Sequence, residues 1–282
     1  MVIDGTRVGI SLAAREGVLY VRWQDEAQWP GSLQSLIGQG GQALQDAGRA
    51  LARAPEVEQA CIRFLPPLGE PPKIVCLGLN YADHSSETGL QVPSYPTVFG
   101  RFASSLVGHG ETIRRPRVST QLDYEGELAA VIGTGGRDIS KARALDHVIG
   151  YSVFNDASVR DYQVRTPQWT VGKNFDTTGA FGPFFVTADE LPAGAAGLSL
   201  TTRLNGRVVQ QASTTDMIFD VATQVSLLSE VFTWQPGDVV ITGTPAGVGV
   251  ARRPQLWMAP GDVCEVEVEG VGLLRNPIAD AT

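Results

Sequence analysis

The spacing of hydrophobic and polar positions divides this chain into two stretches of different character. Near the N-terminus, short alternating runs over 6–11 and 17–22 predict a β-hairpin. Apolar residues then recur at helical spacing over 40–53, and Ser32 is placed to cap a shorter helix over 33–37. These elements predict a small α+β unit.

A proline-rich segment separates this unit from the rest of the chain. Four prolines lie within residues 66–72, a composition typical of a stiff, extended linker. We therefore expect a domain boundary there, with a small N-terminal domain over 1–70 and a larger domain over 71–282.

The larger stretch is predicted to consist mainly of strands. Asn205-Gly206 lies between two alternating runs and is a strong hairpin signal. The pattern predicts an α+β, β-rich protein in which a mostly antiparallel sheet closes on itself, with helices outside. The expected strands are 73–77, 97–101, 122–132, 151–155, 198–204, 207–211, 238–242, 263–268 and 271–274, and the expected helices are 80–87, 139–147, 159–164 and 215–232.

Composition and charge narrow the classes of function. The 282 residues include 30 Asp and Glu against 22 Lys and Arg, a net charge of −8, which argues against nucleic-acid binding. Three widely spaced cysteines without a CxxC pair favour a reducing compartment over a disulfide framework or a zinc knuckle. The sequence has no signal-peptide pattern and no apolar run of membrane-spanning length. We expect a cytoplasmic protein without nucleic-acid or membrane partners.

Two glutamates provide the first candidate chemistry. Glu125 and Glu127 are two residues apart in the strand expected over 122–132, so both side chains point to one face. Asp156 follows another expected strand and adds a third carboxylate. Three carboxylates without a His or Cys favour Mg²⁺ or Mn²⁺, and Ca²⁺ also suits this donor set. The alternatives are two solvated glutamates on an exposed strand, and an Asp156 that caps the following helix.

His84 and Glu87 are a candidate general base. They are three residues apart on a short predicted helix and therefore share a face, where the carboxylate would orient the imidazole and raise its basicity. The other two histidines, His109 in a Gly-His-Gly turn and His147 near a helix end, are predicted to be surface residues.

Four further polar residues could bind an anionic substrate. Arg160 and Gln163 share a helix face and suit a carboxylate or keto group, although an ordinary surface helix has the same pattern. Lys173 lies among aromatic and apolar residues, where it could pair with the carboxylates or stabilise an oxyanion, or extend to solvent. Thr244 lies in a glycine-rich turn that could present donors to an anion. That turn lacks the Lys-Ser/Thr ending of a nucleotide-binding loop.

The order of these motifs resembles that of the fumarylacetoacetate hydrolase family across residues 73–275. The resemblance rests on five segments: Gly78-Leu79-Asn80-Tyr81-Ala82-Asp83-His84 with Glu87; Asp123-Tyr124-Glu125-Gly126-Glu127-Leu128; Asn155-Asp156 with Arg160-Asp161 and Gln163; Gly172-Lys173-Asn174-Phe175-Asp176-Thr177 with Gly182-Pro183; and Thr242-Gly243-Thr244-Pro245 with Gly247-Val248-Gly249.

The resemblance implies a mixed β-roll or barrel catalytic domain and a homodimer. It implies that Mg²⁺ or Mn²⁺ binds Glu125, Glu127 and Asp156. It also implies that His84 and Glu87 activate water on a mobile lid, that Lys173 stabilises an oxyanion or enolate, and that three further residues orient the substrate, namely Arg160, Gln163 and Thr244. Arg101 stands where many family members have a nearby lysine, so substrate preference could differ there.

These roles lead to a hypothesis for the reaction. We expect a metal-dependent hydrolase that cleaves a C–C bond of an acylpyruvate (a 2,4-diketo acid) such as maleylpyruvate or fumarylpyruvate, releasing pyruvate and a carboxylic acid. The alternatives are a decarboxylase or tautomerase of an oxaloacetate-like 2-keto diacid, and a hydrolase of a 2,4-diketo-3-deoxy sugar acid. A metal-binding structural or ligand-sensing protein without turnover is a further alternative, and the presence of every expected polar residue argues against it. The fold alone does not distinguish these reactions.

Overall fold

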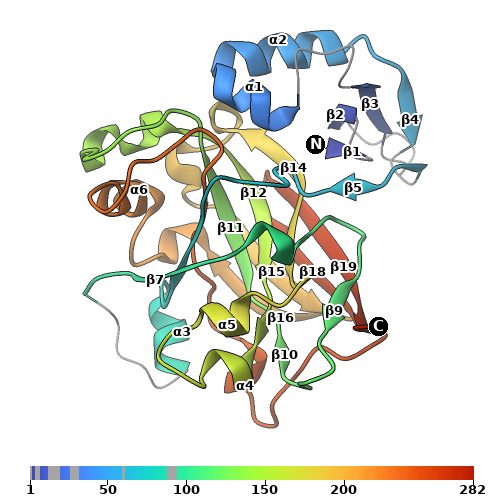
Figure 1. Cartoon of the computed structure of the whole chain (residues 1–282), viewed down its shortest axis with the longest axis vertical. Coiled ribbons are helices and arrows are strands. Elements are labelled where there is room, and N and C mark those ends of the chain that lie inside the picture. Colours follow the sequence, from blue (N-terminus) through green and yellow to red (C-terminus); the bar gives the residue numbers. More distant parts are fainter. Residues whose placement is uncertain (1, 4–6, 12–19, 26–31, 59–60, 88–93) are drawn as a thin grey trace.

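Two curved sheets pack face to face, and a smaller N-terminal sheet with two helices lies at one end of them (Figure 1). This is seen in a computed structural model that describes residues 2–3, 7–11, 20–25, 32–58, 61–87 and 94–282. The α+β, β-rich class expected from the sequence is confirmed.

The N-terminal sheet has the order β4-β3-β2-β1-β5. Its central pair, β2 (Arg7–Ser11) and β3 (Tyr20–Asp25), is antiparallel as expected, and the predicted turn between them lies outside the described residues. The helix α1 (Leu33–Gln39) begins after Ser32, whose hydroxyl accepts a hydrogen bond from the Ser35 N–H, so the predicted cap is confirmed. The remaining elements are α2 (Gly41–Leu51), β1 (Val2–Ile3), β4 (Glu56–Glu58) and β5 (Phe64–Leu65).

The larger sheet has the order β7-β6-β17-β11-β12-β14-β8. Its centre is the antiparallel pair β11 (Gly126–Ile132) and β12 (Val148–Asp156). Parallel pairing of β6 with β17 and of β8 with β14 makes the sheet mixed. The outer strands are β6 (Ile74–Gly78), β7 (Thr97–Gly100), β8 (Leu106–Val107), β14 (Gly179–Thr187) and β17 (Val239–Ile241).

The second sheet of this pair has the order β16-β15-β18-β19-β9. The predicted hairpin is confirmed, because β15 (Ser199–Leu204) and β16 (Arg207–Ser213) pair around Asn205-Gly206, and both turn residues have positive φ. The other strands are β9 (Ile113–Arg115), β18 (Val263–Val268) and β19 (Gly272–Asp280).

Alternating side chains of β11 bury both faces of the larger sheet. Leu128 and Ala130 belong to a core shared with strands of the second sheet, whereas Ala129 and Val131 pack in another apolar cluster on the opposite face. That second cluster includes Ile37 of α1, so the N-terminal segment shares a core with the sheet. The boundary between residues 70 and 71 stays a prediction.

Several expected elements are wrong in their extent or type. The strand over 122–132 is interrupted after β10 (Leu122–Asp123) and resumes at Gly126. The helix over 215–232 is only α6 (Val221–Ser229), because Asp220 caps it by accepting the Thr223 N–H and residues 214–216 form a separate 3₁₀ turn. The α-helix expected over 139–147 is wrong as well, because residues 141–147 form a 3₁₀ helix.

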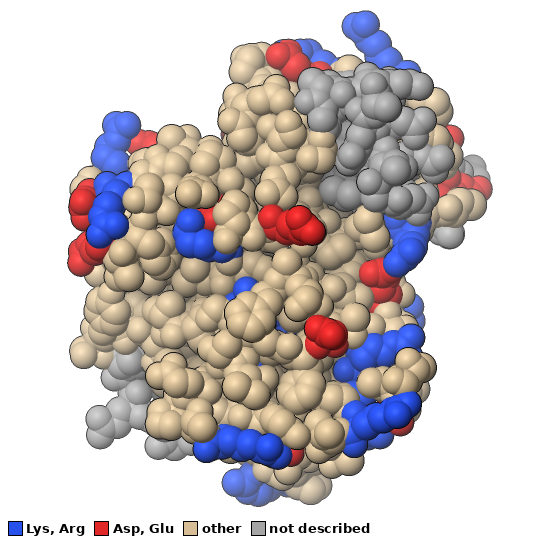
Figure 2. Space-filling model, in the orientation of Figure 1, with Lys and Arg blue, Asp and Glu red and all other residues tan. Residues whose placement is uncertain are grey.

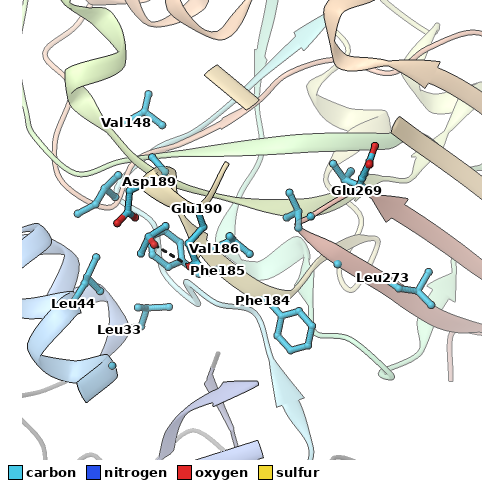
Figure 3. Close-up of a pocket in the computed structure, with 18 of the residues that line it drawn as sticks. Leu33, Leu44, Val148, Phe184, Phe185, Val186, Asp189, Glu190, Glu269 and Leu273 are labelled. Carbon is cyan, nitrogen blue, oxygen red and sulfur yellow. Dashed lines mark hydrogen bonds between the residues drawn. The ribbon is translucent and has the colours of Figure 1, made fainter. Parts of the chain in front are cut away.

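One cavity lies away from the predicted site residues. It has a volume of about 1260 Å³ and separates α1 and α2 from β14 and the start of β19. Figure 3 shows Leu33 and Leu44 on its helical side and Phe184, Phe185 and Val186 on its strand side. Among the described residues, no helix is both long enough and apolar enough to cross a lipid bilayer.

Candidate metal and substrate site

Asp123 lies at the point where the predicted strand breaks before the site. Its carboxylate accepts hydrogen bonds from the N–H groups of Gly249 and Val250, at 2.7 and 2.9 Å, and from the adjacent Tyr124 N–H. β10 pairs with β13 (Ser158–Val159) in a separate two-stranded sheet and does not continue into β11. This leaves Glu125 between the two strands, one residue before β11.

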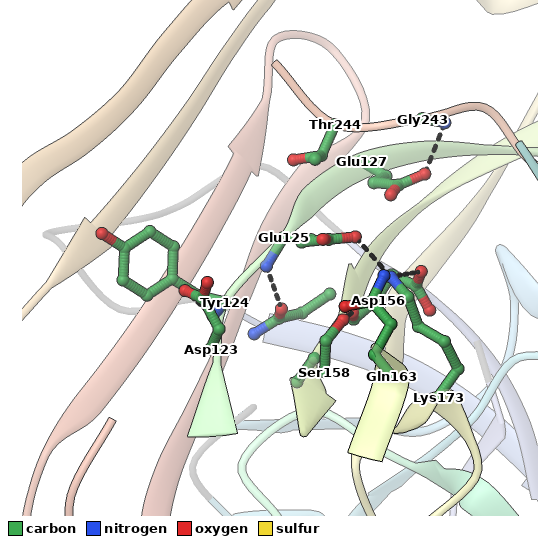
Figure 4. A network of polar contacts seen from close by, with 12 residues as sticks. Asp123, Tyr124, Glu125, Glu127, Asp156, Ser158, Gln163, Lys173, Gly243 and Thr244 are labelled. Atoms are coloured by element: carbon green, nitrogen blue, oxygen red, sulfur yellow. Dashed lines mark hydrogen bonds and ion pairs between the residues drawn. The ribbon is translucent and has the colours of Figure 1, made fainter. Parts of the chain in front are cut away.

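Glu125, Glu127 and Asp156, the carboxylate triad, converge in the interior (Figure 4). Antiparallel pairing places Gly126 opposite Asn155, so the start of β11 meets the end of β12. One oxygen from each of the three carboxylates lies within 4.8 Å of the others, and all three residues are buried. Asp156 does not cap the helix that follows, because the residue before α4 (Arg160–Gln163) is Val159, without a side-chain cap. The exposed-strand alternative is wrong as well.

Three buried cations neutralise most of this charge. Lys173, at the end of α5 (Thr170–Lys173), places Nζ 2.6 Å from Glu125 Oε2 and 2.6 Å from Asp156 Oδ2. Arg160 Nη1 lies 2.6 Å from Glu125 Oε1, and its Nε donates to Asp123 at 2.8 Å. Arg101 forms an ion pair with Asp156 from the other side.

The pKa values of Glu125 and Glu127 move in opposite directions because the cations are unevenly placed. Burial alone would raise the pKa of Glu125, but attraction by Lys173 and Arg160 lowers it to about 2. Burial and the charges of Asp156 and Glu125 raise the pKa of Glu127 well above its usual range. Burial opposes the charge of Lys173, yet the adjacent carboxylates raise its pKa, so it stays protonated.

The donor set fits a hard divalent cation. Glu127 accepts a hydrogen bond from the Gly243 N–H, but among the described residues no Lys or Arg forms an ion pair with it. The buried cluster therefore has four carboxylates, those of Asp123 and the triad, against three cations. Closely spaced carboxylate oxygens without His or Cys ligands suit Mg²⁺, Mn²⁺ or Ca²⁺.

His84 and Glu87 form the expected pair on α3 (Ala82–Glu87). His84 Nδ1 lies 2.9 Å from Glu87 Oε1, and the imidazole is buried. Glu87 also accepts the Gly247 N–H at 2.8 Å, which fixes the carboxylate as an acceptor. Nδ1 is therefore the donor of the pair, and in the neutral ring Nε2 is the basic nitrogen.

The three residues predicted to orient a substrate differ in how fully they are engaged. Arg160 Nη1 donates to Gln163 Oε1 at 2.8 Å, while Nη2 is buried without a hydrogen-bond partner among the described residues. The Thr244 hydroxyl donates to the Gly126 carbonyl at 3.0 Å and accepts from Gln210 Nε2 at 2.8 Å. Arg160 therefore keeps a donor for a ligand, whereas Thr244 is already bonded twice.

A single cavity of about 750 Å³ connects these groups, a size typical of small-molecule sites. Asp156 lies beneath its surface. The predicted residues that line it are His84, Glu87, Glu125, Glu127, Arg160, Gln163, Lys173 and Thr244.

Sequence reasoning missed several groups that hold the site in place. Asp123, Arg101 and Gln210 act through partners far away in the chain, as when Gln210 accepts the Gly126 N–H at 2.9 Å. Asp123 and Arg101 did lie within or beside the motifs that carried the resemblance. Gln210 had no recognisable local signal.

Comparison with known proteins agrees with this architecture. Residues 73–279 match the family model described as fumarylacetoacetate (FAA) hydrolase, C-terminal. The mitochondrial oxaloacetate tautomerase fahd2 of Xenopus laevis is 38% identical over 275 residues, covering 96% of this chain and 86% of the relative. Human mitochondrial oxaloacetate tautomerase FAHD2A is 38% identical over 277 residues, covering 97% and 88%.

Solved structures with the same fold span several activities. A fumarylacetoacetate hydrolase from Exiguobacterium antarcticum aligns with a TM-score of 0.83 and 37% identity, over 99% of this chain and 97% of that one. A 2-hydroxyhepta-2,4-diene-1,7-dioate isomerase from Mycobacterium marinum aligns with a TM-score of 0.69 and 38% identity, over 80% and 81%. On the extent of these matches, the chain belongs to the fumarylacetoacetate hydrolase family.

Proposed function

We propose that this protein interconverts the enol and keto forms of a small 2-keto dicarboxylic acid of the oxaloacetate type, with Mg²⁺ or Mn²⁺ bound by the carboxylate triad. The observation that carries the proposal is that Glu125 and Glu127 of the triad line one cavity together with the protonated Lys173 and the His84–Glu87 pair. The activity for which the tautomerase relatives are named supports this choice over the acylpyruvate hydrolase expected from the sequence.

The binding step would use groups on the floor of the cavity. A bound metal ion would supply Lewis-acid polarisation of the 2-keto oxygen and the adjacent carboxylate. Arg160 would donate from Nη2 to the substrate carboxylate, because this nitrogen has no hydrogen-bond partner among the described residues. Lys173 would stabilise negative charge on the oxygen at C2, since its raised pKa keeps the ammonium charged.

The proton step would use His84. Ketonisation breaks the O–H bond at C2 and forms a C–H bond at C3, so one proton moves and none is lost. His84 Nε2 would accept that proton from the enol oxygen and deliver it to C3. Glu87 would hold the ring orientation through Nδ1 and stabilise the imidazolium formed between the two transfers.

A direct assay tests this proposal. Enol-oxaloacetate is dissolved in an aprotic solvent and diluted into buffer, and the decay of its ultraviolet absorbance is followed with and without enzyme. We expect acceleration that needs Mg²⁺ or Mn²⁺, that is lost in EDTA, and that falls at least 100-fold in Glu127→Gln. A decay rate equal to that of buffer plus metal would reject tautomerase activity.

Acylpyruvate hydrolysis remains the second candidate, because an oriented His–Glu pair also suits the activation of water. Pyruvate release from fumarylpyruvate, maleylpyruvate and a 2,4-diketo-3-deoxy sugar acid would be measured beside CO₂ release from oxaloacetate. Faster pyruvate release than enol decay would favour the hydrolase, and dominant CO₂ release would favour a decarboxylase.

The cytoplasmic location and the homodimer are proposed on the sequence pattern and on the family resemblance, respectively. Several relatives are named as mitochondrial proteins. Size-exclusion chromatography with light scattering tests the homodimer, and a monomer mass near 30.1 kDa would reject it.

A further inference from the structure

Two arginines lie in the lining of the catalytic cavity outside the buried charge cluster. Arg165 follows α4, and Arg253 lies in the loop before Pro254; both are exposed and both line the cavity. Positive side chains also gather on the lower part of the surface in Figure 2, the end of the molecule where α4 lies in Figure 1. We call Arg165 and Arg253 the cationic rim.

The rim differs from the buried cations in its charge balance. Arg160 and Lys173 each form ion pairs with two carboxylates, so most of their positive charge is balanced within the buried cluster, although Arg160 Nη2, unbonded among the described residues, and the ammonium of Lys173 still face the cavity as donors. Among the described residues, neither Arg165 nor Arg253 has a carboxylate partner within 4 Å. The net charge of −8 repels an anion from the chain as a whole, whereas two cations at the cavity mouth without a carboxylate partner in the described part of the chain attract it locally.

Contacts to neighbouring groups hold each rim arginine in place. The guanidinium of Arg165 stacks 3.6 Å from the ring centroid of Tyr162, which packs edge-on against Phe175 at 5.0 Å. Arg253 Nη1 donates to the carbonyls of Val250 and Arg252, at 3.3 and 2.8 Å. Each guanidinium has five N–H donors, so several remain for a ligand.

The loop that carries Arg253 is itself tied to the floor of the cavity. Asp123 accepts the Val250 N–H and also binds Arg160, so one buried carboxylate positions a floor cation and the rim loop together. Glu87, the acidic group of the lining outside the triad, is already bonded to His84 and to the Gly247 N–H.

We infer that the cationic rim binds a second carboxylate of the substrate and makes the site selective for 2-keto diacids over 2-keto monoacids. The inference rests on the proposed function, because it takes the 2-keto carboxylate end of the substrate to lie on the floor. The far carboxylate then lies toward the mouth, where guanidinium groups suit its planar geometry.

A matched ligand pair tests the inference by binding, without turnover. 2-Oxoglutarate and 2-oxopentanoate have the same chain length and differ in the far carboxylate. Each is titrated calorimetrically into enzyme with saturating Mg²⁺. We expect the diacid to bind at least tenfold more tightly than the monoacid. The ratio of the two affinities should fall as the salt concentration rises.

Substitutions assign the preference to the rim. Arg165→Gln and Arg253→Gln should each weaken diacid binding several-fold. In the double variant, the ratio of diacid to monoacid affinity should fall to about one, while the monoacid affinity stays constant. Arg207→Gln, an exposed arginine on β16 outside the cavity, is the matched control and should leave both affinities unchanged.

The outcomes separate this inference from the proposed function. Three outcomes would overturn the inference that the cationic rim binds the second carboxylate. They are equal binding of the two ligands by the unmodified protein, binding of neither ligand, and a preference for the diacid that survives in the double variant. A preference for the diacid that disappears in the double variant supports the role of the rim, whatever the result of the enol-oxaloacetate assay. Enol-oxaloacetate decay that the enzyme does not accelerate would reject only the tautomerase activity.

Discussion

At the scale of single residues, Arg101 provides a buried carboxylate with a buried cationic partner. Its side chain is fully buried, pairs with Asp156, and donates to Thr178 Oγ1 at 2.8 Å and to Ser105 Oγ at 3.2 Å. The guanidinium also lies 5.6 Å from the ring centroid of Phe154. These contacts use the planar fork of an arginine, which a lysine cannot reproduce.

Removal of Arg101 should therefore destabilise the fold. We expect Arg101→Met to lower the free energy of unfolding by about 3–5 kcal/mol, because Asp156 loses a buried partner. Urea unfolding in EDTA measures this loss. Arg143→Met is the control, since that exposed arginine forms a solvent-exposed ion pair with Asp146 and its loss should cost no more than about 0.5 kcal/mol. A loss below 1 kcal/mol in Arg101→Met would show that Lys173 alone neutralises Asp156.

At the scale of elements, the contact of α4 with α5 positions both Arg160 and Lys173. Gly172 lies against the backbone of Gln163, where an added Cβ would come within 2.3 Å of the Gln163 nitrogen. The two short helices can approach this closely only because position 172 has no side chain. This requirement for glycine could not be predicted from the sequence, because the contact joins two separate segments of the chain.

Gly172→Ala should separate the two helices and displace Lys173. We expect a loss of stability of about 1–3 kcal/mol and at least a tenfold loss of catalytic rate. Gly48→Ala in α2 is the control, because no atom lies within 4 Å of its added Cβ and alanine favours a helix. Unchanged enol decay in Gly172→Ala would mean that Lys173 tolerates movement of α5.

The turn that contains His109 should make stability depend on pH. Burial and the charge of Arg275 lower the pKa of His109, and Nδ1 accepts the Arg275 N–H at 3.1 Å. The unfolded chain, with an ordinary histidine pKa near 6.5, therefore takes up the proton first. This contribution to stability is present above about pH 6.5 and is lost as pH falls through the lower folded pKa.

Comparison with His109→Gln isolates this contribution. The difference in unfolding free energy between the unmodified protein and the variant should be constant from pH 7.5 to 8.5 and should shrink on acidification from pH 7 to 5. A difference that stays flat across the whole range would mean that the histidine keeps an ordinary pKa.

Elements with local signals were predictable, and those fixed by distant contacts were not. The Asn205-Gly206 turn and the Ser32 cap follow from backbone preferences of a few adjacent residues. Where the strand breaks, Asp123 accepts hydrogen bonds from N–H groups of residues 249 and 250, more than 120 positions away. The triad was predictable because an i, i+2 pair on a strand faces one side, whereas the pairing of Arg101 with Asp156 appears only after folding.

At the scale of the whole molecule, the N-terminal segment and the sheet share a core. Ile37 is fully buried in a cluster that also contains Val131 of β11 and Ile241 of β17. The two parts should therefore unfold together, because neither can expose this surface without cost to the other.

Ile37→Ala tests this coupling. We expect a loss of about 2–5 kcal/mol in unfolding free energy and a single thermal transition for the entire chain. Gln42→Ala on the exposed side of α2 is the control and should lie within about 0.5 kcal/mol of the unmodified protein. Two separate transitions, with only the first shifted, would mean that residues 1–70 fold as an independent domain.

The separation of floor and rim has a consequence for how such a protein can change. The triad lies in and beside paired central strands, where any substitution disturbs the packed interior. Arg165 and Arg253 lie on exposed connecting segments, where most replacements are tolerated. Natural selection or protein design could therefore change which keto acids are bound by replacing these two exposed residues, without altering the triad or the residues around it.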